Sequence, residues 1–192
     1  MKSTNTHKPK IGNATIQQLR SALLRDGLTA YPLAMQAIAE FRHEVFSILE
    51  RVAQSRATAI SQIVGNAPIR RDSHEVDDFL DGPDTQLSVY TNGPCSFQID
   101  VFWQDVDRPP APVRIGAGVY FEKRAMFEKV DKALQDKFGT KTITDDESWG
   151  CYLEKPIGEK QAGQLEAELG KICDSWIKML RTPKVRKLIQ SK

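Results

Sequence analysis

The sequence predicts a single α+β domain in which a small, mainly antiparallel β-sheet is packed by long α-helices. In the first and last thirds of the chain, apolar residues recur every three or four positions, which is the spacing of an amphipathic helix. Between residues 85 and 155 they recur at every second position, which is typical of half-buried strands. The dipeptide Asn92-Gly93 separates two such stretches and favours a tight hairpin turn, so we expect neighbouring strands to pair antiparallel.

The N-terminal part, residues 13–65, is expected to be helical and to follow a flexible tail at residues 1–12. A short first helix should end at Gly27, and a long second helix should begin at Pro32 and continue to Gly65. At 1.5 Å per residue the second helix would reach about 50 Å, which is longer than a small domain. We therefore expect part of its heptad-like apolar seam to pack against another subunit, the seam being Ile38, Phe41, Val45, Ile48 and Val52.

An acidic connector, residues 66–84, is expected between the helical part and the sheet. It should hold one short helix, capped at Asp72 and ended by Gly82-Pro83. Its acids surround His74, but their spacing does not match a calcium-binding loop, which needs oxygen ligands at alternate positions. We expect a solvated segment and no bound metal.

The sheet with its helix is expected to occupy residues 85–155 as a three-strand meander plus a fourth strand. In the second strand Phe97, Ile99, Val101 and Trp103 share one face, and in the third strand Val113, Ile115, Ala117, Val119 and Phe121 do so. Gly116 and Gly118 lie on the opposite face of the third strand and leave room for a crossing helix, an aromatic ring or, less commonly, a ligand.

The remaining elements are helical, apart from the fourth strand. A helix with Met126, Phe127, Val130, Leu134 and Phe138 on its apolar side should end at Gly139, and the segment TKTITDDES should be a loop. The stretch SWGCYLEK predicts the fourth strand. C-terminal helices are expected over residues 156–192, the first from Ala162 to Leu180 and the second from Pro183.

Composition and motifs exclude several function classes. The apolar share of 40% and charged share of 27% are those of a globular protein, and no apolar run is long enough to cross a membrane. The first residues lack the apolar core of a signal peptide, and Cys95, Cys151 and Cys173 form no CxxC pair, so we expect core thiols in a cytoplasmic protein. No phosphate-binding loop, dinucleotide-binding loop, zinc-protease motif or hydrolase serine motif occurs.

The order helix, three strands, helix, strand over residues 33–155 resembles that of the restriction-endonuclease-like core. This resemblance implies a divalent metal, Mg²⁺, held by an acid on the second strand and an acid-x-lysine pair on the third. The matching residues here are Asp100 and Glu122, with Arg124 in the place of the lysine. Arginine is always protonated and cannot act as a base, so the pattern is degraded.

Binding is supported better than catalysis, and we expect a non-catalytic cytoplasmic binding or regulatory protein that acts through protein–protein contacts, with no cofactor. Phe41, Val45 and Ile48 should mediate contact with a protein partner or a second copy. The basic C-terminus, with Lys184, Arg186 and Lys187, is either a solvated end or a contact for nucleic acid or an acidic partner. The alternative is a metal-dependent nuclease-like or nucleic-acid-binding protein that uses Asp100 and Glu122.

Overall fold

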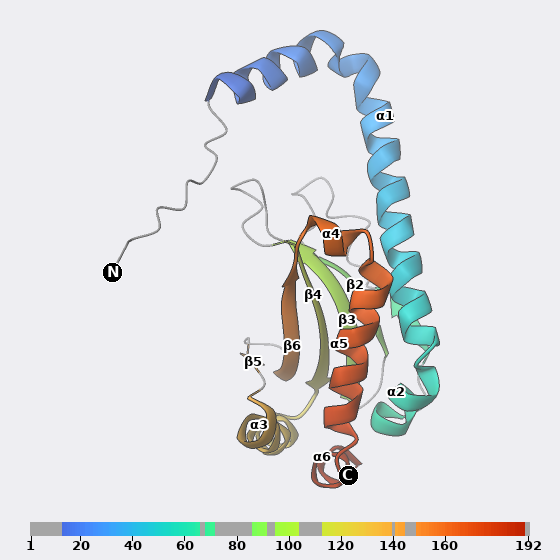
Figure 1. Ribbon diagram of the computed structural model, residues 1–192, viewed down its shortest axis with the longest axis vertical. Helices are drawn as coiled ribbons and strands as arrows, with labels where there is room; N and C mark the ends of the chain where they lie inside the picture. The colour runs from blue at the N-terminus through green and yellow to red at the C-terminus, as the bar shows by residue number, and fades with distance from the viewer. Residues whose placement is uncertain are drawn as a thin grey trace, which may run out of the picture. The chain divides into compact units, whose positions relative to one another are not determined.

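The computed structural model describes residues 13–65, 68–71, 86–91, 95–103, 113–139, 141–144 and 149–190. The chain divides into two compact units, Met1–Arg42 and His43–Lys192, which we call the N-terminal unit and the main unit. The described part of the N-terminal unit is helical throughout. The main unit holds the sheet, the remaining helices and the hydrophobic core (Figure 1).

Helix α1 (Asn13–Gln54) is a single helix, although the sequence predicted two. The predicted end at Gly27 and the predicted start at Pro32 are wrong, because the helix continues through both residues. An internal proline removes one backbone hydrogen bond, and a glycine costs about 1 kcal/mol, but neither ends a helix whose neighbouring residues favour it. Here a leucine follows each of the two positions, and Ala34 and Met35 lie just beyond Pro32.

The predicted long helix is interrupted near its C-terminal end. A turn at Ser55-Arg56 separates α1 from α2 (Ala57–Val64), which ends as expected at Gly65, with φ of 92°. No glycine or proline marks this turn. The Arg56 amide bonds to the carbonyl of Ala53, three residues back, in place of the helical partner four residues back.

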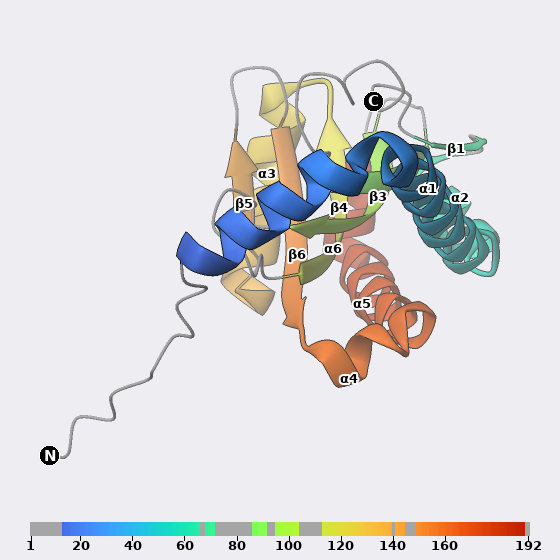
Figure 2. The ribbon, with the colours of Figure 1, turned by 90° about the horizontal axis from the view of Figure 1, so that it is seen from above.

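The sheet confirms the α+β prediction and is antiparallel throughout the described residues. The expected meander consists of β2 (Gln86–Thr91), β3 (Cys95–Trp103) and β4 (Val113–Phe121), and the expected fourth strand is β6 (Trp149–Ile157), which pairs with β4. Two edge strands extend it, giving the order β1-β2-β3-β4-β6-β5 (Figure 2).

Both edge strands were missed by the sequence analysis. β1 (Ile69–Arg71) falls in the predicted connector, and β5 (Lys141–Thr144) falls in the predicted loop. Strands this short show too few alternations to be recognised, even though Thr142 and Ile143 are good strand formers. The short helix predicted from Asp72 to Gly82 lies outside the described residues.

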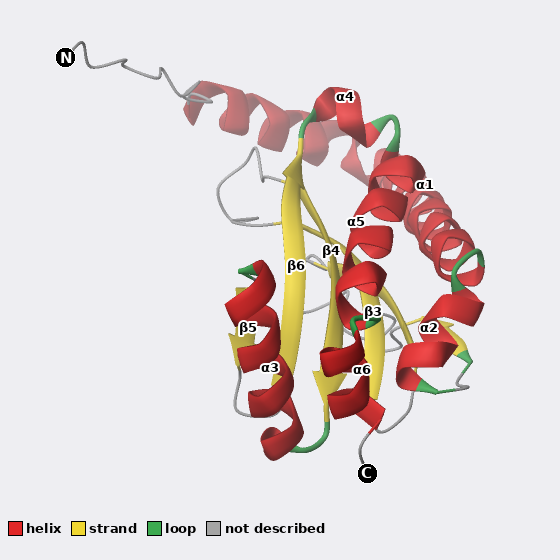
Figure 3. Cartoon of the chain, turned by 60° about the horizontal axis from the view of Figure 1, so that its bottom comes forward, coloured by secondary structure: helices red, strands yellow, loops and turns green. Residues whose placement is uncertain are grey.

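Helices cover one face of the sheet. α5 (Leu165–Leu180) packs across β4, and α3 (Arg124–Phe138) packs against β6 and β4 (Figure 3). The short α4 (Glu159–Ala162) precedes α5, and a turn at residues 163–164 interrupts what the sequence predicted as one helix. α6 (Pro183–Gln190) packs against α3, α2 and α5.

The core lies between this helical layer and the sheet. Ile115, Ala117 and Val119 of β4 are fully buried, as the alternation predicted. α5 contributes a stripe at helical spacing that includes Leu169 and Trp176, both with no exposed surface. The C-terminal part of α1 completes this core with Val45, Leu49 and Val52.

Leu49→Ala should lower the free energy of unfolding by about 3 kcal/mol, because it removes a fully buried side chain and leaves a cavity. Leu33→Ala is the matched control on the same helix, where the side chain is 69% exposed, and it should change stability by less than about 0.5 kcal/mol. Urea unfolding followed by circular dichroism measures both. Equal losses for the two variants would contradict the placement of the core.

Candidate functional site

The sheet face opposite the helices has a buried carboxylate at its centre. Asp100 of β3 has no exposed surface, and its side chain is on the face opposite to that of Ile99 and Val101. Its Oδ1 accepts hydrogen bonds from Gln86 Nε2 at 2.9 Å and Gln98 Nε2 at 2.7 Å. Its Oδ2 accepts one from the Tyr152 hydroxyl at 2.6 Å. These donors occupy both carboxylate oxygens, which is what makes burial of this group tolerable.

Tyr152 reaches Asp100 because two glycines leave room for its ring. A Cβ atom on Gly116 would stand 1.8 Å from the Tyr152 hydroxyl, and one on Gly118 would stand 2.5 Å from the ring. The ring therefore crosses from β6 over β4 to β3, which confirms that an aromatic ring occupies the space predicted over this face. Phe102 packs beside it, with ring centroids 6.3 Å apart.

Burial, together with the charge and hydrogen bonding of Asp100, raises the pKa of Tyr152 well above that of an ordinary phenol. The hydroxyl therefore remains protonated and serves as a donor. The cluster of Asp100, Gln86, Gln98 and Tyr152, which we call the sheet-face cluster, is a hydrogen-bonded support for the sheet.

The structure does not bring Asp100 and Glu122 together. Asp100 is opposite Gly116 in the register of β3 and β4, and Glu122 follows the end of β4. Glu122 is six positions beyond Gly116 along the strand, which at about 3.3 Å per residue is about 20 Å. Arg124 begins α3, where it pairs with Glu128 at 2.8 Å and lies over the Trp149 ring. Among the described residues, no group of three or more His, Cys, Asp or Glu side chains could hold a metal ion.

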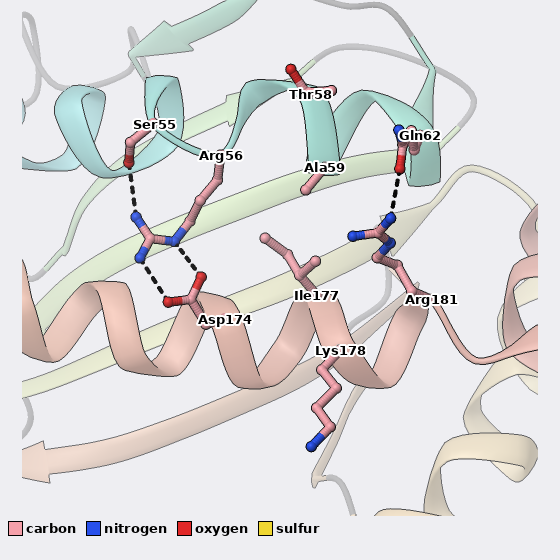
Figure 4. Close-up of a pocket in the computed structure, with 9 residues that line it drawn as sticks. All are labelled: Ser55, Arg56, Thr58, Ala59, Gln62, Asp174, Ile177, Lys178 and Arg181. Carbon is pink, nitrogen blue, oxygen red and sulfur yellow. Dashed lines mark hydrogen bonds and ion pairs between the residues drawn. The ribbon is translucent and has the colours of Figure 1, made fainter.

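A groove between α2 and α5, which we call the interhelical groove, has a volume of about 670 Å³. Arg56 pairs with Asp174 at 2.7 Å at one end, and Arg181 donates to the Gln62 side chain at 2.9 Å at the other (Figure 4). Between these two bridges the lining includes Thr58 and Ala59, and the Ala59 side chain faces Ile177. Sequence reasoning missed this groove, because it depends on how two helices distant in sequence pack.

The basic residues predicted for binding lie on a folded helix. Lys184, Arg186 and Lys187 are exposed on α6, whereas Val185 and Ile189 of the same helix are 1% and 8% exposed and pack into the core. The helix predicted from Pro183 is confirmed, and these three charged side chains face solvent on it.

The predicted seam residues of α1 differ in how exposed they are to solvent. Val45 is 3% exposed and belongs to the core, and Ile48 is partly buried against it. Phe41 is 49% exposed. Sequence reasoning did not single out Tyr31, which is 63% exposed, although its position seven residues before Ile38 places it on the seam side of the helix.

All three cysteines are buried and unpaired, as predicted. Burial raises the pKa of Cys151 and of Cys173 to about 12 and raises that of Cys95 as well. The thiols are therefore protonated at neutral pH and suited to packing rather than to nucleophilic chemistry.

Comparison of the chain with protein-family models, with curated proteins and with solved structures returned no match. In the part of the chain that the structure describes, no helix has both the length and the apolar character needed to cross a membrane.

Gly116→Ala should lower the free energy of unfolding by about 3 kcal/mol, because a methyl group would displace the Tyr152 ring and break its bond to Asp100. Urea unfolding measures the loss. In a Tyr152→Ala background the same substitution should cost much less, which a double-mutant cycle would show as coupling.

Gly163→Ala is the matched control, since its φ is −65° and its nearest neighbouring atom would be 3.9 Å from the added carbon. It should leave stability unchanged or slightly higher. If Gly116→Ala proved as harmless as Gly163→Ala, the support of Tyr152 by these glycines would be refuted.

Proposed function

We propose that this is a non-catalytic cytoplasmic binding or regulatory protein that self-associates through the apolar seam of α1. The single observation behind the proposal is that the seam extends beyond the residues that the core buries. Val45 and Val52 are 3% and 2% exposed, whereas Ile38 and Tyr31, seven and fourteen positions before Val45, are 41% and 63% exposed. Positions seven apart lie on the same side of a helix, so the apolar side is continuous in the sequence pattern.

An isolated helix has little stability of its own in water, because helices in proteins are held mainly by the packing of an apolar side. The described part of the N-terminal unit, residues 13–42, is such a helix. Tyr31 and Ile38 are large enough to supply the knobs of a helix–helix contact, and Met35, which is partly buried, lies between them on the same side. A second copy offers the same apolar side chains, and a two-fold dimer pairs one patch with the same patch of its partner.

The charges along this segment also fit self-association. Residues 31–44 hold the acids Glu40 and Glu44 and the base Arg42, together with His43, so neither sign dominates and two copies do not repel each other strongly. The cytoplasmic placement is supported by the three unpaired thiols of the main unit, since a reducing compartment keeps cysteines in this state.

Ile38→Glu should weaken self-association by at least about 100-fold, because two copies of a charged side chain would replace two apolar contacts in the dimer. Size-exclusion chromatography with light scattering, over a series of protein concentrations, should show a wild-type dimer and a monomeric variant. Circular dichroism should show that the variant remains folded.

Leu33→Glu is the matched control, because it makes the same kind of replacement at an exposed residue on the other side of the helix. It should leave the dimer intact. A wild-type protein that is monomeric at every concentration, or equal weakening by the two substitutions, would refute self-association through this seam.

A further inference from the structure

The ends of three helices meet at Gln62. Its side-chain oxygen accepts a hydrogen bond from Arg181 at the end of α5, at 2.9 Å. Its backbone carbonyl accepts another from Gln190 at the end of α6, at 3.0 Å. Because Arg181 and Gln190 bind the same residue, the chain between them must fold back, and the short α6 is fixed against α2 and α5. We call the surface formed by residues 178–190 the Gln62 corner.

The Gln62 corner holds a concentration of positive charge. The last acid in the sequence is Asp174, and the eighteen residues that follow it contain six lysines and arginines. Since the whole chain has a net charge of +2, the first 174 residues together have a net charge of −4. A nearly neutral chain therefore has an excess of positive charge in its last eighteen residues, and five of these six cations lie in the described residues 178–190. A local excess of this kind attracts a polyanion.

The cations of the corner differ from the other arginines of the helical layer in their ion pairing. Its described cations are Lys178, Arg181, Lys184, Arg186 and Lys187, and none of them forms an ion pair with a described residue. The hydrogen-bond partner of Arg181 is a neutral amide. Along the rest of the same helical layer the arginines are paired, Arg51 with Glu166 and Arg56 with Asp174.

The corner lacks the apolar anchors that a protein partner needs. Protein interfaces are built around buried aromatic and aliphatic side chains, whereas binding to a phosphate backbone requires only cations. Among the described residues, the large apolar side chains that are exposed are Tyr31, Leu33, Ile38, Phe41 and Phe138, and none of them lies in residues 178–190. An acidic protein is therefore a poorer fit than a nucleic acid.

We propose that the Gln62 corner binds the phosphate backbone of nucleic acid without reading its sequence. Lys178 and Arg181 line the interhelical groove, and Lys184, Arg186 and Lys187 are exposed on α6, which follows α5 in the chain. Contacts of this kind release counterions from the nucleic acid, so the affinity depends strongly on salt. This binding is independent of self-association, although two copies in one dimer would raise the apparent affinity.

Fluorescence anisotropy tests the proposal with the full chain and a labelled duplex of about 20 base pairs of mixed sequence. We expect a dissociation constant in the range of about 10⁻⁴ to 10⁻⁶ M, which rises steeply between about 50 and 200 mM salt. Lys184→Glu/Lys187→Glu should weaken binding at least tenfold and should lower the salt slope by about 1 to 2, because two phosphate contacts are lost. Circular dichroism should show that the double variant is folded.

Arg70→Glu/Lys160→Glu is the matched control, with the same change of charge at two exposed residues of β1 and α4. Lys160 precedes α5, whereas Lys184 and Lys187 follow it, and a helix of 16 residues, about 24 Å long, lies between them in the chain. The control should bind within about threefold of wild type. No binding by the wild-type chain at low salt, binding insensitive to salt, or equal weakening by the two double variants would each overturn the proposal.

Discussion

The packing of α5 across β4 is the constraint on which the rest of the structure depends. The middle of β4 is fully buried, and α5 covers it with a stripe in which Leu169 and Trp176 have no exposed surface. With α5 fixed by this contact, its outer side becomes the surface on which the first helices dock. Arg51 forms an ion pair with Glu166, and Arg56 forms one with Asp174. Gln62 accepts a hydrogen bond from Arg181, so three polar contacts are spaced along α5 and its end. The Arg56 guanidinium lies close to α5 at Gly170, where an added Cβ would stand 2.8 Å from it.

The sequence predicted what depends on local pattern and missed what depends on contacts between distant segments. Alternation over nine residues identified β3 and β4, since a slip of one residue would expose a whole apolar face. β1 has three residues and no such signal, and it is held instead by Arg71, which bonds to Glu50 of α1 at 2.7 Å and lies over the Phe46 ring. The turn at Ser55-Arg56 was missed for the same reason, because Arg56 pairs with Asp174, 118 positions away.

The candidate sites also divide into features that local sequence patterns predict and features that depend on contacts between distant segments. Alternate glycines in one strand were sufficient to predict that a helix, an aromatic ring or a ligand lies close against this face, because the absence of side chains is visible in the sequence. The identity of the ring was not predictable, since Tyr152 is 52 positions from Asp100 and reaches it only through the register of β4 with β3 and β6. Likewise, Asp100 and Glu122 are residues suited to metal binding, but register and strand rise place them about 20 Å apart.

The two proposed binding surfaces depend on different physics, and this difference follows from how each segment is folded. The seam of α1 offers apolar area with balanced charge, which suits a partner that buries it. The Gln62 corner offers charge without exposed large apolar side chains, because α6 directs Val185 and Ile189 into the core and keeps its lysines and arginine outside. In an unfolded tail the same cations would lose conformational freedom on binding a polyanion. Because α6 is folded and packed against the core, the backbone that holds these cations is already ordered. Binding a polyanion therefore costs less conformational entropy, and less of the electrostatic attraction is cancelled by that cost.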